Sequence, residues 1–191
     1  MLKGRYINAL HRAAFDFRTA VDRFQRHFSI NYEEVILMFH EDPKIDELFT
    51  DAQFKFMDEE FEDSIELFTK VIELDKGFAK AWQARAIAHL RVDDKEKALS
   101  DIDEAIRLEP ENHRFHYHKG AILFKYELLD EAVESLSRAI DLAPDYGPAY
   151  LLRSEVFDRL GEEEASAADF NKADVLRKEQ TAASKVVDFW R

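Results

Sequence analysis

The sequence predicts an all-α fold of stacked helical hairpins, and three observations predict it. In residues 79–112, large and small apolar residues alternate at helical spacing, with a polar break at Asp93–Asp94 and a stop at Pro110. The same arrangement recurs every 34 residues on both sides of this stretch. No stretch alternates polar and apolar residues over the length of a strand, so we expect no sheet.

Composition narrows the class of protein. The chain has 191 residues, of which 46% are hydrophobic and 35% charged, enough for one packed domain. It has no cysteine, which excludes disulfides, thiolate metal sites and a cysteine nucleophile and fits a reducing compartment. The longest apolar run, Val35–Phe39, is too short to cross a membrane, and the N-terminus lacks the apolar core of a secretory signal. We therefore expect a cytoplasmic protein.

The charge is unevenly distributed along the chain. The formal net charge is −13, yet residues 1–28 hold six basic and two acidic residues, a net +4 that leaves −17 on the rest. We call residues 1–28 the basic arm. An acidic remainder repels phosphates, so we expect no nucleic-acid partner.

Residues 1–44 predict a helical extension outside the 34-residue pattern. An apolar stripe at spacings of three and four predicts a helix from about Arg5 to His27. The stripe consists of Leu10, Ala14, Phe17, Val21, Phe24 and Phe28. Asn31, with Glu34 three residues later, has the spacing of a capping box and predicts a short second helix over 32–41 that ends before Pro43.

Four 34-residue repeats follow, at residues 45–78, 79–112, 113–146 and 147–180. Each is expected to form two antiparallel helices that approach closely at small residues. Position 4 of the repeats holds Leu48, Trp82, His116 and Tyr150, and position 8 holds Ala52, Ala86, Gly120 and Ser154. Pro110 and Pro144 end repeats 2 and 3 at position 32. Repeat 4 has Lys178 there instead, so its second helix is expected to run on or to be followed directly by another.

This pattern resembles the tetratricopeptide repeat (TPR), whose period is 34 residues and whose signature positions these are. The resemblance covers 136 of the 191 residues. It implies a right-handed superhelix, an α-solenoid, whose first helices line a concave groove. A solenoid exposes an apolar face at each end, so residues 181–191 are expected to form a C-terminal cap and the basic arm an N-terminal one.

The resemblance also implies which residues face the groove, namely positions 2, 5, 9, 12 and 13 of each first helix. On this sequence the candidate groove residues are Phe49, Gln53, Phe56, Lys80, Gln83, Ile87, Leu90, Arg91, Arg114, Tyr117, Ala121, Phe124, Lys125, Leu151, Glu155 and Arg159. Asp46, Met57, Pro148 and Asp158 occupy the remaining positions. Positions 5, 9 and 12 offer an apolar, aromatic floor that suits an extended or helical peptide.

Position 13 is basic in three successive repeats, as Arg91, Lys125 and Arg159, and Lys80 and Arg114 add to this charge. Two interpretations are open. These cations pair with acids of neighbouring repeats, in exposed pairs worth about 0–1 kcal/mol, or they bind an acidic, partly apolar partner segment.

Some TPR adaptors hold the C-terminal carboxylate of heat-shock chaperones with Lys, Asn and Arg at fixed groove positions. The equivalent positions here are Phe49, Gln53, Ala84, Arg114 and His118, or, one repeat later, Gln83, Ile87, His118, Pro148 and Leu152. Neither set supplies the clamp, so we do not expect a chaperone-tail adaptor.

We expect no enzyme, no catalytic residue and no cofactor. The sequence has no phosphate-binding glycine loop, no Gly-x-Ser-x-Gly and no His-Glu-x-x-His. His113 and His116 could share a helix face and bind a metal, but His116 stands where an aromatic ring packs within the repeat. We favour packed and surface histidines over a metal site.

The leading hypothesis is therefore a scaffold that binds a protein or peptide partner. The alternatives are a structural protein that self-assembles through the basic arm, and a secretion chaperone, which rests on architecture alone. Self-association or capping would use Leu10, Phe17, Val21, Phe24 and Phe28.

Three interpretations of the basic arm compete. It could lie on a membrane surface, act as an organelle-targeting presequence, or pack on protein, either its own repeats or another copy. Asp16 and Asp22 argue against a presequence. Burial of a phenylalanine gains about 1.5–3 kcal/mol, so the stripe favours packing on protein, with the aromatic residues of repeat 1 as a candidate surface.

Overall fold

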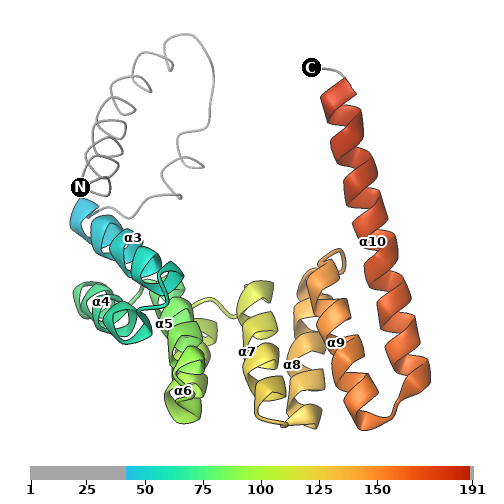
Figure 1. The fold of residues 1–191 in the computed structure, drawn as a ribbon, viewed down its shortest axis with the longest axis horizontal. Helices are drawn as coiled ribbons and strands as arrows, with labels where there is room; N and C mark the ends of the chain where they lie inside the picture. Colours follow the sequence, from blue (N-terminus) through green and yellow to red (C-terminus); the bar gives the residue numbers. More distant parts are fainter. Residues whose placement is uncertain (1–41, 190–191) are drawn as a thin grey trace. The chain divides into compact units, whose positions relative to one another are not determined.

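The computed structural model describes residues 42–189, with the backbone alone at residue 180 and residues 182–189. Over these residues the chain forms eight helices and no strand, so the all-α prediction is confirmed for the described part (Figure 1). The first helices of the four repeats are α3 (Pro43–Met57), α5 (Ala79–Arg91), α7 (His113–Lys125) and α9 (Gly147–Leu160). The second helices are α4 (Phe61–Leu74), α6 (Lys95–Leu108), α8 (Leu129–Leu142) and α10 (Glu163–Phe189). The helices expected at 5–27 and 32–41 lie outside the described residues.

The helices stack in chain order. From α4 onwards each helix contacts the next, and α5 contacts α7 while α7 contacts α9. The described residues from Lys44 onwards form one compact unit. The first helices α5, α7 and α9 therefore lie beside one another, which is the arrangement that a shared binding face requires.

Small side chains let the two helices of a repeat approach closely. Ala86 and Ala98, at positions 8 and 20 of repeat 2, are both fully buried. In repeat 3 a methyl group added to Gly120 would lie 2.6 Å from Leu136 Cγ, so only glycine fits there without a shift. In repeat 1 the buried Ser64 hydroxyl donates a hydrogen bond to the Ala52 carbonyl at 2.9 Å.

The turn inside each repeat uses a left-handed residue at position 15. These residues are Glu59 (φ 62°), Asp93 (φ 62°), Glu127 (φ 57°) and Gly161 (φ 78°). A residue in the left-handed conformation ends the first helix. This conformation costs free energy for Glu and Asp, whereas glycine adopts it without strain. In repeat 2 the second helix begins directly afterwards, because the Asp94 carboxylate accepts a hydrogen bond from Lys97 N at 3.2 Å.

In repeats 2 to 4, position 4 joins the first helix to the turn before it. Trp82 Nε1 donates to Lys76 O at 2.9 Å, and the Tyr150 hydroxyl donates to Pro144 O at 3.3 Å. His116 Nε2 lies 2.9 Å from the equivalent carbonyl of Pro110. The side chain at position 4 thus satisfies the carbonyl at position 32, which is why a histidine serves as well as tryptophan or tyrosine.

Position 7 ties three helices together through a half-buried arginine. Arg85 donates two hydrogen bonds to the Asp101 carboxylate, at 2.7 and 2.8 Å, and a third to Thr69 Oγ1 of the preceding repeat at 3.0 Å. Arg153 repeats the arrangement two repeats later, with Asp169 at 2.6 and 2.9 Å and Ser137 Oγ at 2.7 Å. In the repeat between them, Lys119 Nζ lies 2.7 Å from Asp103 of the preceding repeat.

The last helix is much longer than the others. α10 runs from Glu163 to Phe189 without a break and extends well beyond the N-terminal end of the antiparallel helix α9 (Figure 1). Because repeat 4 lacks the proline at position 32, the second helix of the repeat runs on, the first of the two outcomes expected from the sequence. No helix within residues 42–189 has an apolar stretch long enough to cross a membrane.

Candidate functional site

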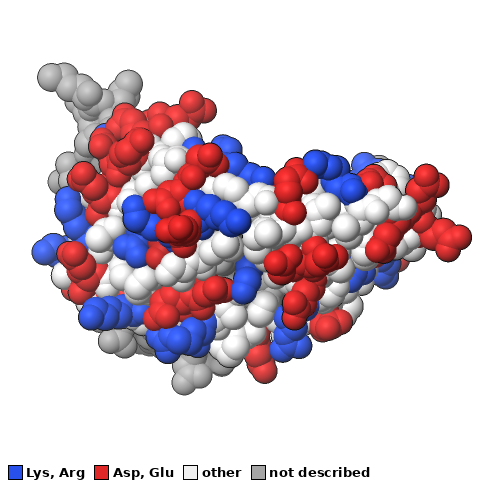
Figure 2. All heavy atoms as spheres, turned by 90° about the horizontal axis from the view of Figure 1, so that it is seen from below, with Lys and Arg blue, Asp and Glu red and all other residues white. Residues whose placement is uncertain are grey.

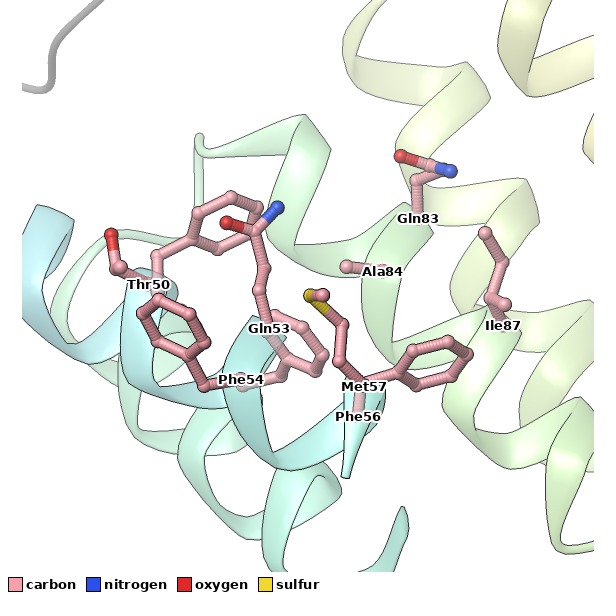
Figure 3. A pocket seen from close by; sticks show the side chains of 10 residues that line it. Thr50, Gln53, Phe54, Phe56, Met57, Gln83, Ala84 and Ile87 are labelled. Atoms are coloured by element: carbon pink, nitrogen blue, oxygen red, sulfur yellow. The ribbon is translucent and has the colours of Figure 1, made fainter. Parts of the chain in front are cut away.

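A mostly apolar pocket opens between the first helices of repeats 1 and 2 (Figure 3). Its volume is about 410 Å³. The close-up shows side chains of α3 on one side and Gln83, Ala84 and Ile87 of α5 on the other. The lining residues are Phe49, Thr50, Gln53, Phe54, Phe56, Met57, Phe68, Gln83, Ala84 and Ile87.

Five of the candidate groove residues meet in this pocket: Phe49, Gln53, Phe56, Gln83 and Ile87. Thr50, Phe54, Phe68 and Ala84 also line the pocket but are not among the candidate groove residues. Thr50 and Ala84 both stand at position 6 of a first helix, so position 6 was the signal that could have found them. Phe68 comes from the second helix α4 and reaches the pocket floor only because the helices pack closely.

Aromatic side chains form the wall of the pocket. The ring of Phe49 lies 5.5 Å from that of Phe68 and 5.0 Å from that of Phe78, between ring centroids. Such tilted pairs hold their rings in fixed positions. At the mouth, Met57 is 74% exposed and Phe54 41% exposed. Large apolar side chains left in water beside a cavity are typical of a surface that binds another molecule.

The polar side chains that line the pocket are uncharged. They are Thr50, Gln53 and Gln83. A glutamine amide offers both donor and acceptor groups, so it can pair with the backbone of a bound peptide. The pocket can therefore accept an apolar side chain together with the peptide groups beside it.

One cation lies at the edge of this pocket. The Arg91 guanidinium carbon lies 5.9 Å from the centre of the Phe56 ring and 5.6 Å from that of Phe61. Stacking on these rings holds the charge beside Phe56, which lines the pocket.

The other two cations at position 13 bind acids of the preceding repeat. Lys125 Nζ lies 2.6 Å from the Leu90 carbonyl and 3.0 Å from Asp93 Oδ1. The hydrogen bond from Lys125 holds the pKa of the Asp93 carboxyl below its usual value. Arg159 Nη2 lies 2.7 Å from each carboxylate oxygen of Glu127. This geometry favours inter-repeat pairing for Lys125 and Arg159 over a role in binding a ligand.

The remaining candidate groove residues do not line the pocket. Lys80, Arg114 and Glu155 are exposed on their helices. The Tyr117 ring packs edge-on against Tyr146 at 5.4 Å, and burial raises the pKa of the Tyr117 hydroxyl. The full set outside the pocket is Lys80, Leu90, Arg91, Arg114, Tyr117, Ala121, Phe124, Lys125, Leu151, Glu155 and Arg159. The candidates for self-association in the basic arm lie outside the described residues.

The histidines near the start of α7 make contacts of their own. The His113 ring packs edge-on against Tyr146 at 4.8 Å. Burial, with a smaller effect from Arg114, lowers the pKa of His118 to about 4. Within residues 42–189 no group of three or more His, Asp and Glu side chains could hold a metal ion.

Charges of both signs are mixed over the surface. On the face drawn in Figure 2, Lys and Arg alternate with Asp and Glu, with uncharged surface between them. Mixed charge gives this face little net attraction for a polyanion.

Comparisons with known proteins agree with the repeat pattern. A family profile described as "Tetratricopeptide repeat" matches residues 83–147 and residues 127–183, which together span more than half of the chain. A protein SGT1 homolog of Oryza sativa subsp. japonica is 30% identical over 112 residues. That match covers 59% of this chain and 30% of the rice protein, so the chain spans less than a third of that relative.

Solved structures show the same fold. A crystal structure of MamA has a TM-score of 0.67 at 20% identity, and the match covers 79% of this chain and 87% of that one. The first TPR of Spaghetti (RPAP3), bound to the HSP90 peptide SRMEEVD, has a TM-score of 0.59 at 22% identity, with 64% of this chain and 98% of that one covered. At such identities the likeness concerns the fold alone.

Proposed function

The chain belongs to the tetratricopeptide repeat family, and we propose that it is a non-enzymatic scaffold that binds a partner protein through a peptide or helix. The observation that carries this proposal is the apolar pocket between α3 and α5, on the face formed by the first helices. Its aromatic wall and exposed mouth suit an apolar anchor side chain, and its two glutamines suit the backbone of the bound segment.

The partner segment combines an apolar anchor with an acidic residue next to it. The anchor enters the pocket between Phe49 and Ile87, and the acid contacts Arg91 at the edge. One position-13 cation beside the pocket, rather than a row of three, implies a modest salt dependence, because only one exposed charge pair is screened.

The bound segment lies within the partner chain rather than at its C-terminus. The RPAP3 TPR is bound to an HSP90 peptide that ends in Asp. Capture of a terminal carboxylate needs cations in the groove, whereas the side chains that line this pocket are uncharged or apolar. An internal segment has no terminal carboxylate to satisfy and fits such a lining better.

The test is a selection of peptides from a random library on the full chain, followed by binding measurements on filled variants. Ala84→Trp places a bulky ring in the pocket and should abolish binding of the selected peptides while leaving the unfolding temperature nearly unchanged. Ala121→Trp adds the same bulk to the first helix of repeat 3, outside the pocket, and serves as the matched control. If Ala121→Trp abolishes binding and Ala84→Trp does not, the site lies elsewhere on the array.

A further inference from the structure

α10 exposes an apolar face whose equivalent is buried in the second helices of the other repeats. Position 24 of the second helices holds Phe68, Ile102 and Leu136, each at most 1% exposed. The equivalent residue of α10, Phe170, is 57% exposed. Removing apolar surface from water is favourable, so an exposed phenylalanine at this position favours a partner on the face.

The chain itself shows what covers such a face. In repeats 2 and 3 the cover is the first helix of the next repeat, which packs an apolar residue at position 10 against position 24. Ile102 lies in one buried cluster with Phe115 and Ile122, and Leu136 in another with Val156. Next to this contact, the cation at position 7 reaches a polar side chain at position 25, as Arg153 reaches Ser137 at 2.7 Å.

α10 has the polar side chain that this arrangement needs. Asn171 stands at position 25, where Thr69, Asp103 and Ser137 receive the cations of the following repeats. Asn171 is exposed. Asp174 replaces the isoleucine found at position 28 of the other repeats, and Arg177 and Lys178 of the same helix pair with its carboxylate. The face therefore combines an apolar ring with polar groups. Such a face suits a helix that is both apolar and basic.

One further segment of the sequence carries the pattern of a covering helix. Residues 14–21 read AFDFRTAV, and residues 149–156 of α9 read AYLLRSEV. Ala14, Arg18 and Val21 thus stand at positions 3, 7 and 10. The motif of an aromatic residue, two residues, a cation and a small residue occurs elsewhere in the chain only at the starts of α5, α7 and α9.

We infer that residues 14–21 of a second copy of the chain pack on α10 as the first helix of a fifth repeat. Val21 covers Phe170, and Arg18 reaches Asn171. The net charge of +4 on the basic arm complements the acidic remainder. In this arrangement the segment and the face belong to different copies. The contact is heterologous and produces a closed ring or an open chain of subunits.

The experiment measures mass against concentration for the full chain by sedimentation velocity. Wild type should rise above the 22.4 kDa of one chain, whereas Phe170→Asp alone and Val21→Asp alone should stay at it. Val175→Asp is the matched control. Val175 is a 47% exposed apolar residue of the same helix, at a position that holds exposed Glu73, Arg107 and Asp141 in the other repeats. This control should behave as wild type, and circular dichroism should show that every variant is folded.

Mixing the Phe170→Asp and Val21→Asp variants tests whether the arm of one copy binds the α10 face of another. The Phe170→Asp copy keeps its arm and the Val21→Asp copy keeps its face, so an equimolar mixture should form a two-chain complex that grows no further. Arg18→Glu should act as Val21→Asp does, which guards against misfolding of one variant. A wild type that remains monomeric at every concentration, a mixture that stays monomeric, or a Val21→Asp variant that still dimerises through α10 would each overturn the inference. None of these outcomes depends on the pocket between α3 and α5.

Discussion

Arg159 binds Glu127 of the preceding repeat through both carboxylate oxygens, and Lys125 binds Asp93 at the same two repeat positions one repeat earlier. The cation at position 13 thus pairs with the acidic residue at position 15 of the preceding repeat, whose left-handed backbone ends the first helix of that repeat. In repeats 1 to 3 an acidic residue adopts the unfavourable positive φ at position 15, whereas repeat 4 has Gly161 there. These pairs join neighbouring first helices and leave Arg91 as the cation beside the pocket.

The position-13 pairs should contribute little to stability. Arg159 and Glu127 are 54% and 55% exposed, and exposed pairs are worth about 0–1 kcal/mol. Arg159→Ala should therefore lower the free energy of unfolding by less than about 1 kcal/mol, as measured in urea. A double-mutant cycle with Glu127→Ala that returned a much larger coupling would show that the pair is protected from solvent.

The position-7 arginines should matter far more. Arg153 and Asp169 are 18% and 10% exposed, and removal of one partner strands a charge that is mostly buried. Loss of one partner of a buried pair costs about 3–5 kcal/mol. Arg153→Ala should approach that range and exceed Arg159→Ala clearly in the same denaturation experiment. Equal losses for the two variants would contradict the assigned roles.

Gly120 tests the close approach of α7 and α8. A methyl group at Gly120 would lie 2.6 Å from Leu136 Cγ, so Gly120→Ala should overpack the repeat at a cost of about 1–3 kcal/mol. Gly147→Ala is the matched control, because its nearest neighbour outside the adjacent backbone is Leu176 Cβ at 3.7 Å. The control should be neutral or slightly stabilising, since alanine favours a helix over glycine. A Gly120→Ala variant as stable as wild type would contradict the packing described.

Acid should destabilise the fold through two histidines, His118 and His89, whose pKa values the fold lowers. Burial lowers the pKa of His118 to about 4 and lowers that of His89 as well, against about 6.5 in the unfolded chain. Between these values the unfolded state binds more protons, so stability falls as the pH drops from about 6.5 towards 4. His118→Gln should flatten this slope, with up to about one linked proton lost. An unchanged slope would mean that His118 titrates normally in the fold.

The 34-residue frame predicted most of the fold, since the apolar spacing and the breaks at Asp93 and Pro110 locate the helices. The sequence did not reveal which cations are engaged, because Lys125 and Arg159 meet acids 32 residues away through geometry that spacing alone does not give. The pocket floor depends on Phe68, from a helix that the groove pattern does not include. Charge partners and cavities arise from packing between repeats, whereas helices arise from spacing within one.

The most direct test of the account maps a library-selected peptide onto the full chain by amide chemical shifts in two-dimensional NMR. The account predicts that the largest changes fall on the side-chain amides of Gln53 and Gln83 and on the backbone around Ile87. Arg91→Glu should weaken binding of an acidic peptide, and the same substitution should also reduce its salt dependence. Changes centred on α7 and α9, with Gln53 and Gln83 unaffected, would contradict the claim that the pocket between α3 and α5 is the binding site.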